Sequence, residues 1–201
     1  TLGAGVSALM VDDAIVYPWC YKEGEILDNG PLRFTVKLEF NPMNVKGDTT
    51  IVETRVITLD AGSHLNRTTI TYNNLQESLP VVTGIVLHDT IGAIVADAKS
   101  GYMTYVDPTT GPGQGQIFVG AAFLEDVNEA KPVRFSDEER RRRNNAYGHV
   151  LSYSEYEPND EYVYYWGFAW DQADIQTAEA WDEYMKAFAK KVRNPLEVKL
   201  K

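Results

Sequence analysis

The stretch TTIVETRVITLDAGSHLNRTTITYNNLQESLPVVTGIVLH, residues 49–88, indicates the fold class. Side chains alternate with a period of two between residues 50 and 59, which is typical of a β-strand. Asp60-Ala61-Gly62 is expected to turn the chain, because glycine tolerates a positive φ angle there. Residues 65–72 return with β-branched side chains, and residues 81–87 form a third, more apolar run. This stretch predicts three successive antiparallel strands of one sheet.

Strand-like runs separated by turn residues recur on both sides of this stretch. Asp28-Asn29-Gly30-Pro31 is a turn signal that precedes residues 32–40, where apolar and polar residues alternate as in a half-buried strand. The other expected strands are residues 6–10, 14–17, 91–96, 102–106, 117–124, 146–156 and 161–170. Roughly ten strands with regularly spaced turns predict an all-β fold, a sandwich of two antiparallel sheets.

The period changes from two to that of a helix only near the C-terminal end. Thr177 is a candidate N-cap, and Asn194-Pro195 is expected to end this one C-terminal helix before an extended tail over residues 196–200. Its expected inner face comprises Trp181, Tyr184, Met185 and Phe188. Ser136 and Glu139 have the spacing of a capping box, which predicts a short surface helix in a charged segment.

Length and charge restrict the kind of protein and of partner. The chain has 201 residues, which suits a single domain over residues 1–201 with a sizeable core. Its net charge of −10 argues against nucleic acid or an anionic membrane surface as a partner, because both bind a basic surface. No apolar run is long enough to span a bilayer. The single cysteine, Cys20, excludes an intrachain disulfide.

The histidines are the first candidates for acid–base chemistry. His88 ends an apolar strand and precedes Asp89, and strand ends that meet loops often carry sites. The structural alternative is a half-buried histidine whose hydrogen bonds go to Asp89 or to a backbone carbonyl. His64 follows the turn at Gly62 and is interpreted as a solvated loop residue.

Tyr147 and His149 form a second candidate pair. A period of two places both on one face of the expected strand 146–156, where they could act as acid and base on a sugar ring. The alternative is that both belong to an aromatic face together with Tyr153.

The last long strand carries an aromatic face that includes Tyr164, Trp166 and Trp170. Such a face could stack against sugar rings, whose C–H faces are apolar. The alternative is a packing surface, with the C-terminal helix as the expected partner. Arg143, at the end of an arginine run, could hold a carboxylate, or it could belong to a solvated charged segment. No metal-ligand spacing and no cofactor motif is found.

Several segments together resemble the core of one family. They are Thr1-Leu2-Gly3-Ala4-Gly5 with Ala8-Leu9, Asp28-Asn29-Gly30-Pro31-Leu32-Arg33, Leu59-Asp60-Ala61-Gly62-Ser63, Thr83-Gly84-Ile85-Val86-Leu87-His88, Tyr165-Trp166-Gly167-Phe168-Ala169-Trp170 and the helix at Trp181. The family is the bacterial domain of unknown function 4861, found in secreted proteins of polysaccharide-degrading gut bacteria. The resemblance covers nearly the whole chain.

The resemblance implies a galactose-mutarotase-like supersandwich, an architecture that hosts sugar mutarotases, glycan lyases and accessory domains of glycoside hydrolases. Similar proteins are associated with the breakdown of uronate-containing glycans, which implies a carbohydrate ligand and a periplasmic or secreted location. His88 is the only matched position that is a transferable polar candidate. The family usually has a segment before the Leu-Gly-Ala-Gly motif, so an upstream N-terminal segment or an attached enzyme domain is expected to be missing from this chain.

Two classes of function therefore remain open. The first is an enzyme on uronate polysaccharides: a lyase or hydrolase-associated domain, with His88 or His149 as base, Tyr147 as acid and an arginine that neutralises the carboxylate. A mutarotase could use the same groups. The second is a non-catalytic carbohydrate-binding module, which would explain the aromatic strands without catalytic residues. The fold alone does not decide between them.

Overall fold

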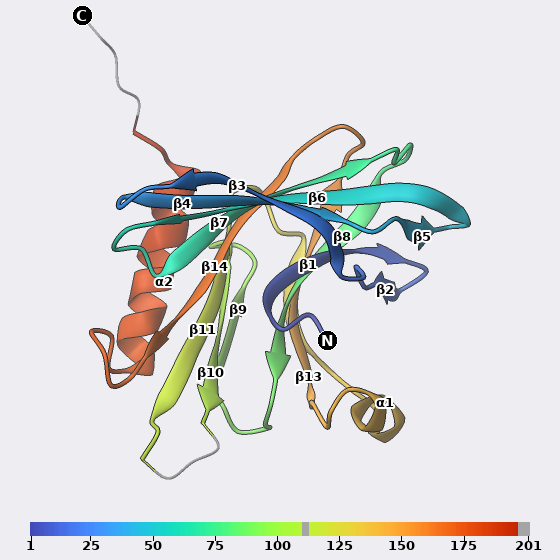
Figure 1. The fold of residues 1–201 in the computed structure, drawn as a ribbon. Helices are drawn as coiled ribbons and strands as arrows, with labels where there is room; N and C mark the ends of the chain where they lie inside the picture. Colours follow the sequence, from blue (N-terminus) through green and yellow to red (C-terminus); the bar gives the residue numbers. More distant parts are fainter. Residues whose placement is uncertain (110–112, 197–201) are drawn as a thin grey trace, which may run out of the picture.

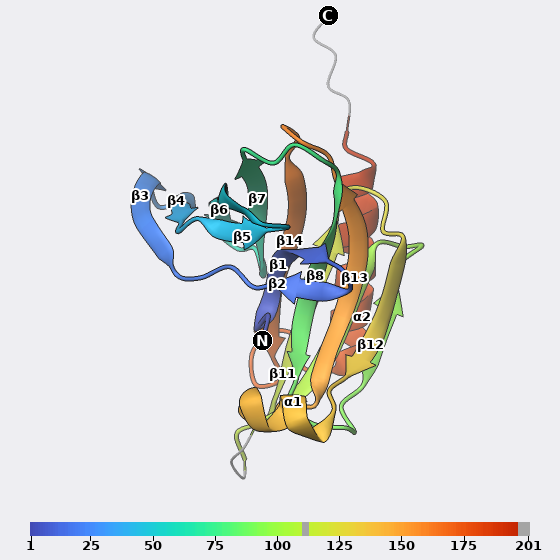
Figure 2. The same cartoon turned by 90° about the vertical axis from the view of Figure 1, so that its right-hand side faces the viewer.

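The computed structural model describes residues 1–109 and 113–196, whose strands form two antiparallel sheets packed face to face (Figures 1 and 2). The predicted all-β sandwich with a C-terminal helix is therefore confirmed. Of the predicted extended tail, residues 197–200 lie outside the described part of the chain.

The smaller sheet has five strands in the order β12-β13-β8-β1-β2. Their bounds are Glu129–Arg134, Gly148–Tyr156, Leu79–Leu87, Ala4–Val11 and Ala14–Val16. Asp12 and Asp13 have φ angles of 49° and 60°, so they form the tight turn that the sequence predicts between β1 and β2.

The larger sheet has nine strands, eight of them in the order β3-β4-β6-β7-β14-β11-β10-β9. The bounds of those eight are Tyr21–Asn29, Arg33–Phe40, Asp48–Asp60, Leu65–Asn73, Tyr162–Trp170, Gln116–Phe123, Tyr102–Pro108 and Ile94–Asp97. The ninth strand, β5 (Met43–Val45), pairs with β6.

One part of the prediction for residues 49–88 is wrong. β6 and β7 form the expected hairpin, with Gly62 at a φ angle of 76° in the turn. β8, however, pairs with β1 and β13 in the other sheet. Asn74, at a φ angle of 68°, redirects the chain after β7, and β8 then runs almost wholly buried through the centre of the smaller sheet. A strand buried on both faces has no alternation that would reveal its sheet.

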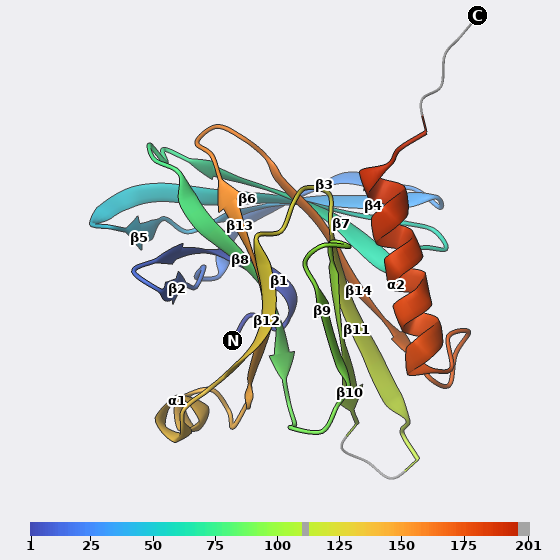
Figure 3. The same cartoon turned by 180° about the vertical axis from the view of Figure 1, so that it is seen from behind.

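The main core lies between the two sheets, and a second one lies under the C-terminal helix. Helix α2 (Ala178–Arg193) starts after the N-cap Thr177 and packs on the outer face of β10 and β11, as Figure 3 shows. Trp181 and Met185 are buried there, which confirms the predicted inner face. A Cβ on Gly120 would lie 2.8 Å from the Met185 methyl group, so the absence of a side chain allows this close approach.

Two charged side chains join the sheets at the centre of the molecule. Arg55 on β6 is buried, donates a hydrogen bond to Glu53 and donates another to the Ser7 carbonyl of β1 at 2.9 Å. Burial raises the pKa of Glu53, although Arg55 acts against this. The alternation in β6 correctly places both on one side, but that side faces the core.

The nine-stranded sheet extends beyond the five-stranded one. β3 and β4 lie in this extension (Figure 2), and apolar side chains of β4 such as Phe34 are exposed. The expected half-buried strand 32–40 is thus a strand whose apolar face has little cover. β3, β5 and β12 are not predicted from the sequence. The capping box at Ser136 correctly predicts the short helix α1 (Asp137–Arg142).

Candidate functional site

His88 and Asp107 form an exposed histidine–carboxylate pair between the two sheets. His88 directly follows β8, and its Nδ1 lies 2.8 Å from Oδ2 of Asp107 on β10. The His88 side chain is 56% exposed and that of Asp107 is 19% exposed. Because a carboxylate accepts the Nδ1 proton, the lone pair of the neutral imidazole lies on Nε2. A histidine held in this way can act as a general base.

A buried tyrosine fixes the backbone that carries His88. The Tyr105 hydroxyl donates to Oδ1 of Asp89 at 2.8 Å and accepts the backbone N–H groups of His88 and Asp89, each at 3.2 Å. The N–H of Gly92 also donates to the Asp89 carboxylate, at 3.0 Å. Burial and the Asp89 hydrogen bond raise the pKa of Tyr105, so its hydroxyl stays protonated and keeps its hydrogen bonds to the turn at residues 88 and 89.

Exposed aromatic side chains lie on the same face as Asp107. In the sheet register Asp107 pairs with Ile117, and Ile117 pairs with Trp170. Phe168 lies two residues before Trp170, so it points to the same side. Two strand spacings separate Asp107 from Trp170, which is about 10 Å between backbones. Phe168 is 59% exposed and Trp170 43%, so both can contact a ligand.

We call His88, Asp107, Phe168 and Trp170 the inner-face site. The Trp170 indole donates to the Gln114 carbonyl at 2.8 Å, which fixes the ring at the end of β14. A positive side chain lies beside the site: Arg134 on β12 donates from Nη1 to the Asp89 carbonyl at 3.2 Å. The inner-face site offers a base and an aromatic surface, and Arg134 beside it offers a cation; such groups can together contact an acidic sugar.

The second predicted acid–base pair is not brought together. His149 is 1% exposed, and its Nε2 accepts the backbone N–H of Leu2 at 3.0 Å. Burial lowers its pKa to about 4, and the nearby positive charges act in the same direction. Tyr147 precedes β13 and packs against the main core, with Arg140 over its ring. The prediction that they share a strand face is wrong, because the strand begins after Tyr147.

Two of the three predicted platform residues are not available as a flat binding surface. Tyr164 is 1% exposed and belongs to the core between the sheets. Trp166 packs against that core, and its indole donates to Thr68 at 2.8 Å. The face is buried at its N-terminal half and open at Trp170, because the smaller sheet covers only part of the strand. The C-terminal helix packs on the opposite face, against Ala169.

Arg143 is bound within the protein rather than free for substrate. Its Nη1 donates to the Tyr17 hydroxyl at 2.8 Å, and its guanidinium lies over the rings of Tyr17 and Phe135. His64, predicted to be a loop residue, pairs with Asp174 at 2.9 Å, away from the inner-face site.

The sequence pattern does not single out Asp107 or Arg134 as candidate site residues. Asp107 shares its strand face with Tyr105, but only the pairing of β10 with β11 and the end of β8 bring it to His88. Within residues 1–109 and 113–196, no group of three histidine, cysteine or acidic side chains is placed to hold a metal ion. In the same residues, no helix is long and apolar enough to cross a membrane.

Comparisons with known proteins assign a family but no activity. A family model described as a domain of unknown function (DUF4861) matches residues 1–198. An uncharacterized protein, P7, of Formosa agariphila is 26% identical over 200 residues, which make up 98% of this chain and 47% of that protein. The chain thus spans about half the length of this curated relative. No solved structure matches, so the galactose-mutarotase-like architecture implied by the resemblance stays a prediction.

Proposed function

The chain belongs to the DUF4861 family, and on this premise we propose that it is a carbohydrate-active protein that acts on uronate-containing polysaccharides. The observation that supports this proposal most strongly is the inner-face site. An exposed histidine on a carboxylate lies on the same face as two exposed aromatic rings. The backbones of Asp107 and Trp170 lie about 10 Å apart, a distance that a disaccharide stacked on the Trp170 ring can bridge.

The reaction that fits these groups is elimination at a uronate. Nε2 of His88 removes the proton at C5, the bond from C4 to its oxygen breaks, and a C4–C5 double bond forms. The protonated His88 then returns its proton to the departing oxygen, so the step is balanced. Arg134 supplies the positive charge that makes the C5 proton acidic by pairing with the carboxylate, and Asp107 orients the imidazole.

The experiment is an absorbance assay for unsaturated uronate with pectic and host uronate polymers as substrates. We expect product from the unaltered chain and at least a hundredfold lower rate in His88→Ala, which removes the base. His64→Ala is the matched control, since His64 also pairs with an aspartate but lies elsewhere. Equal rates in the two variants would show that His88 is not the base. Release of reducing ends without ultraviolet absorbance would indicate hydrolysis instead.

A non-catalytic binding module is the second candidate. The state of the Tyr105 hydroxyl favours this candidate, because that hydroxyl makes three hydrogen bonds to residues 88 and 89 and is not free to act as an acid. This candidate predicts sugar binding without turnover. The binding should be lost in Trp170→Ala and kept in His88→Ala, which a titration of the purified chain can measure.

A further inference from the structure

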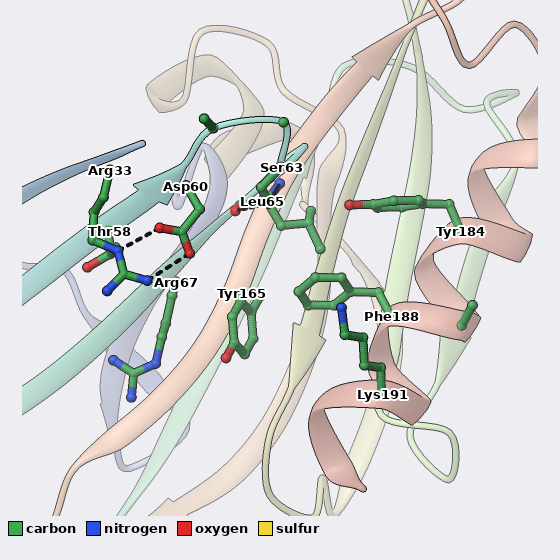
Figure 4. A pocket seen from close by; sticks show the side chains of 13 residues that line it. Arg33, Thr58, Asp60, Ser63, Leu65, Arg67, Tyr165, Tyr184, Phe188 and Lys191 are labelled. Atoms are coloured by element: carbon green, nitrogen blue, oxygen red, sulfur yellow. Dashed lines mark hydrogen bonds and ion pairs between the residues drawn. The ribbon is translucent and has the colours of Figure 1, made fainter. Parts of the chain in front are cut away.

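A groove of about 760 Å³ lies on the outer face of the nine-stranded sheet (Figure 4). The inner-face site lies on the opposite face of the same sheet. β4, β6, β7 and β14 form one wall, and α2 forms the other. The side chains that carry the argument are those of Arg33, Arg67, Tyr165, Tyr184, Phe188 and Lys191. We call it the outer groove.

The outer groove carries aromatic side chains and a cationic side chain on each of its two walls. Arg67 on β7 is the register partner of Tyr165 on β14. The Tyr165 ring meets the Phe188 ring edge to face, with 5.0 Å between centroids. Tyr184 precedes Phe188 by four residues and Lys191 follows it by three, so all three project from one face of α2. Arg67 therefore lies beside Tyr165 on the strand wall, and Lys191 lies beside Phe188 on the helix wall, as Figure 4 shows.

The charge of the outer groove is opposite to that of the whole chain. Three cationic side chains and one carboxylate, Asp60, line it, in a chain of net charge −10. Arg33 is paired, because its Nε and Nη2 donate to both Asp60 oxygens at 2.6 and 2.9 Å. Arg67 instead donates to the Thr69 hydroxyl at 2.7 Å. In the described part of the chain no ion pair is found for Arg67 or Lys191. Their charges are therefore available to a ligand.

We propose that the outer groove binds an anionic oligosaccharide. Arg67 and Lys191 bind carboxylate or sulfate groups of the ligand. The adjacent rings of Tyr165 and Phe188 together contact the apolar face of one of its sugar rings. A guanidinium binds a planar or tetrahedral oxyanion through paired N–H groups, and aromatic rings suit sugar C–H faces. The choice of a sugar rests on the proposed function, whereas the location is separate from the inner-face site. The outer groove would hold a polymer chain on the outer face while the inner face acts on it.

Titration calorimetry in a Phe168→Ala/Trp170→Ala background tests the outer groove, because that background removes both exposed aromatic rings of the inner-face site. The probes are trigalacturonate, its methyl ester and a sulfated galactose oligosaccharide. We expect an acidic probe to bind, and Arg67→Met or Lys191→Met to weaken it about tenfold, the effect of losing one charge-assisted contact. Arg141→Met on α1, an exposed arginine far from the outer groove, is the matched control and should leave the dissociation constant unchanged.

Each outcome decides the proposal. Binding of only the carboxylate probe or only the sulfate probe supports it and identifies the anionic group. Equal binding of the methyl ester overturns it, because then charge is not recognised. It is also overturned if Arg67→Met and Lys191→Met bind as the control does, or if no acidic probe binds. None of these results bears on the turnover assay of the unaltered chain, so failure of the outer groove and failure of the proposed function can be distinguished.

Discussion

His88 and His149 come from neighbouring strands of one sheet, yet their surroundings are opposite. His149 is the register partner of Val86, two residues before His88. The His88 side chain is 56% exposed and pairs with Asp107 of the other sheet. His149 is 1% exposed and accepts a hydrogen bond from the Leu2 backbone. His88 is thus available for chemistry, whereas His149 is a buried structural residue that binds the N-terminal segment at Leu2.

The difference arises from where the strands end. His149 lies inside β13, so alternation turns its ring to the outer side, against Phe135. His88 lies just beyond β8, where the turn held by Tyr105 directs it toward β10. A residue inside a strand is positioned by the register, whereas a residue after its end is positioned by the turn. The contrast shows that a histidine positioned by strand register can become part of the packing, whereas a histidine positioned by a turn can stay exposed and available for chemistry.

The largest expected difference between the two histidines is in the pH dependence of stability. Protonation of His149 in the unfolded chain should destabilise the fold at low pH. Burial lowers its pKa from 6.5 to about 4. Between these pH values the unfolded chain takes up a proton at this position and the folded chain does not. The free energy of unfolding therefore falls by about 3 kcal/mol as the pH drops through this window. Below the window, His149 causes no further decrease.

Urea unfolding between about pH 7 and pH 4 measures this loss. His149→Gln cannot take up a proton, so subtracting its pH dependence from that of the unaltered chain isolates the histidine. The difference should persist in a His88→Ala background. If the His149→Gln variant loses stability with falling pH as steeply as the unaltered chain, His149 does not titrate as its burial requires.

Truncating the two side chains should also separate them at neutral pH. His149→Ala leaves the buried Leu2 N–H without an acceptor and removes packing against Phe135, so we expect a loss of about 2 kcal/mol. His88→Ala removes an exposed ring and should change the free energy of unfolding by less than about 0.5 kcal/mol. Chemical unfolding measures both, and similar losses would refute the contrast.

Local signals in the sequence predict much of the fold. The β6–β7 hairpin follows from alternation and from Gly62, and α2 follows from its apolar face and from Thr177, because each signal lies within the element it defines. β3 was missed because every residue of it is exposed, so no buried face imposes a pattern. The sheet that β8 joins is predicted wrongly because β8 is buried on both faces, so its sequence has no alternation that would indicate its partner strands.

The candidate site was harder to predict, because it depends on contacts between the sheets. The sequence singles out His88 as a strand-end histidine, but its partner Asp107 lies 19 residues further on, in the other sheet. Periodicity also places Tyr164 and Trp170 on one face without showing where the smaller sheet stops covering it. That boundary decides that Tyr164 is core and Trp170 is exposed.

The smallest expected effect concerns the carboxylate that makes His88 different from His149. Oδ1 of Asp107 is buried and has no hydrogen-bond partner in the described residues, whereas its Oδ2 lies 2.8 Å from Nδ1 of His88. In the proposed elimination, the Asp107 carboxylate orients the His88 imidazole through this contact. We expect Asp107→Asn to lower kcat about tenfold, the value of one charge-assisted hydrogen bond, with KM and stability unchanged. Asp174→Asn, at the His64 pair, is the matched control and should leave kcat unchanged. A raised KM at constant kcat in Asp107→Asn would instead mean that the carboxylate binds the sugar and does not position the base.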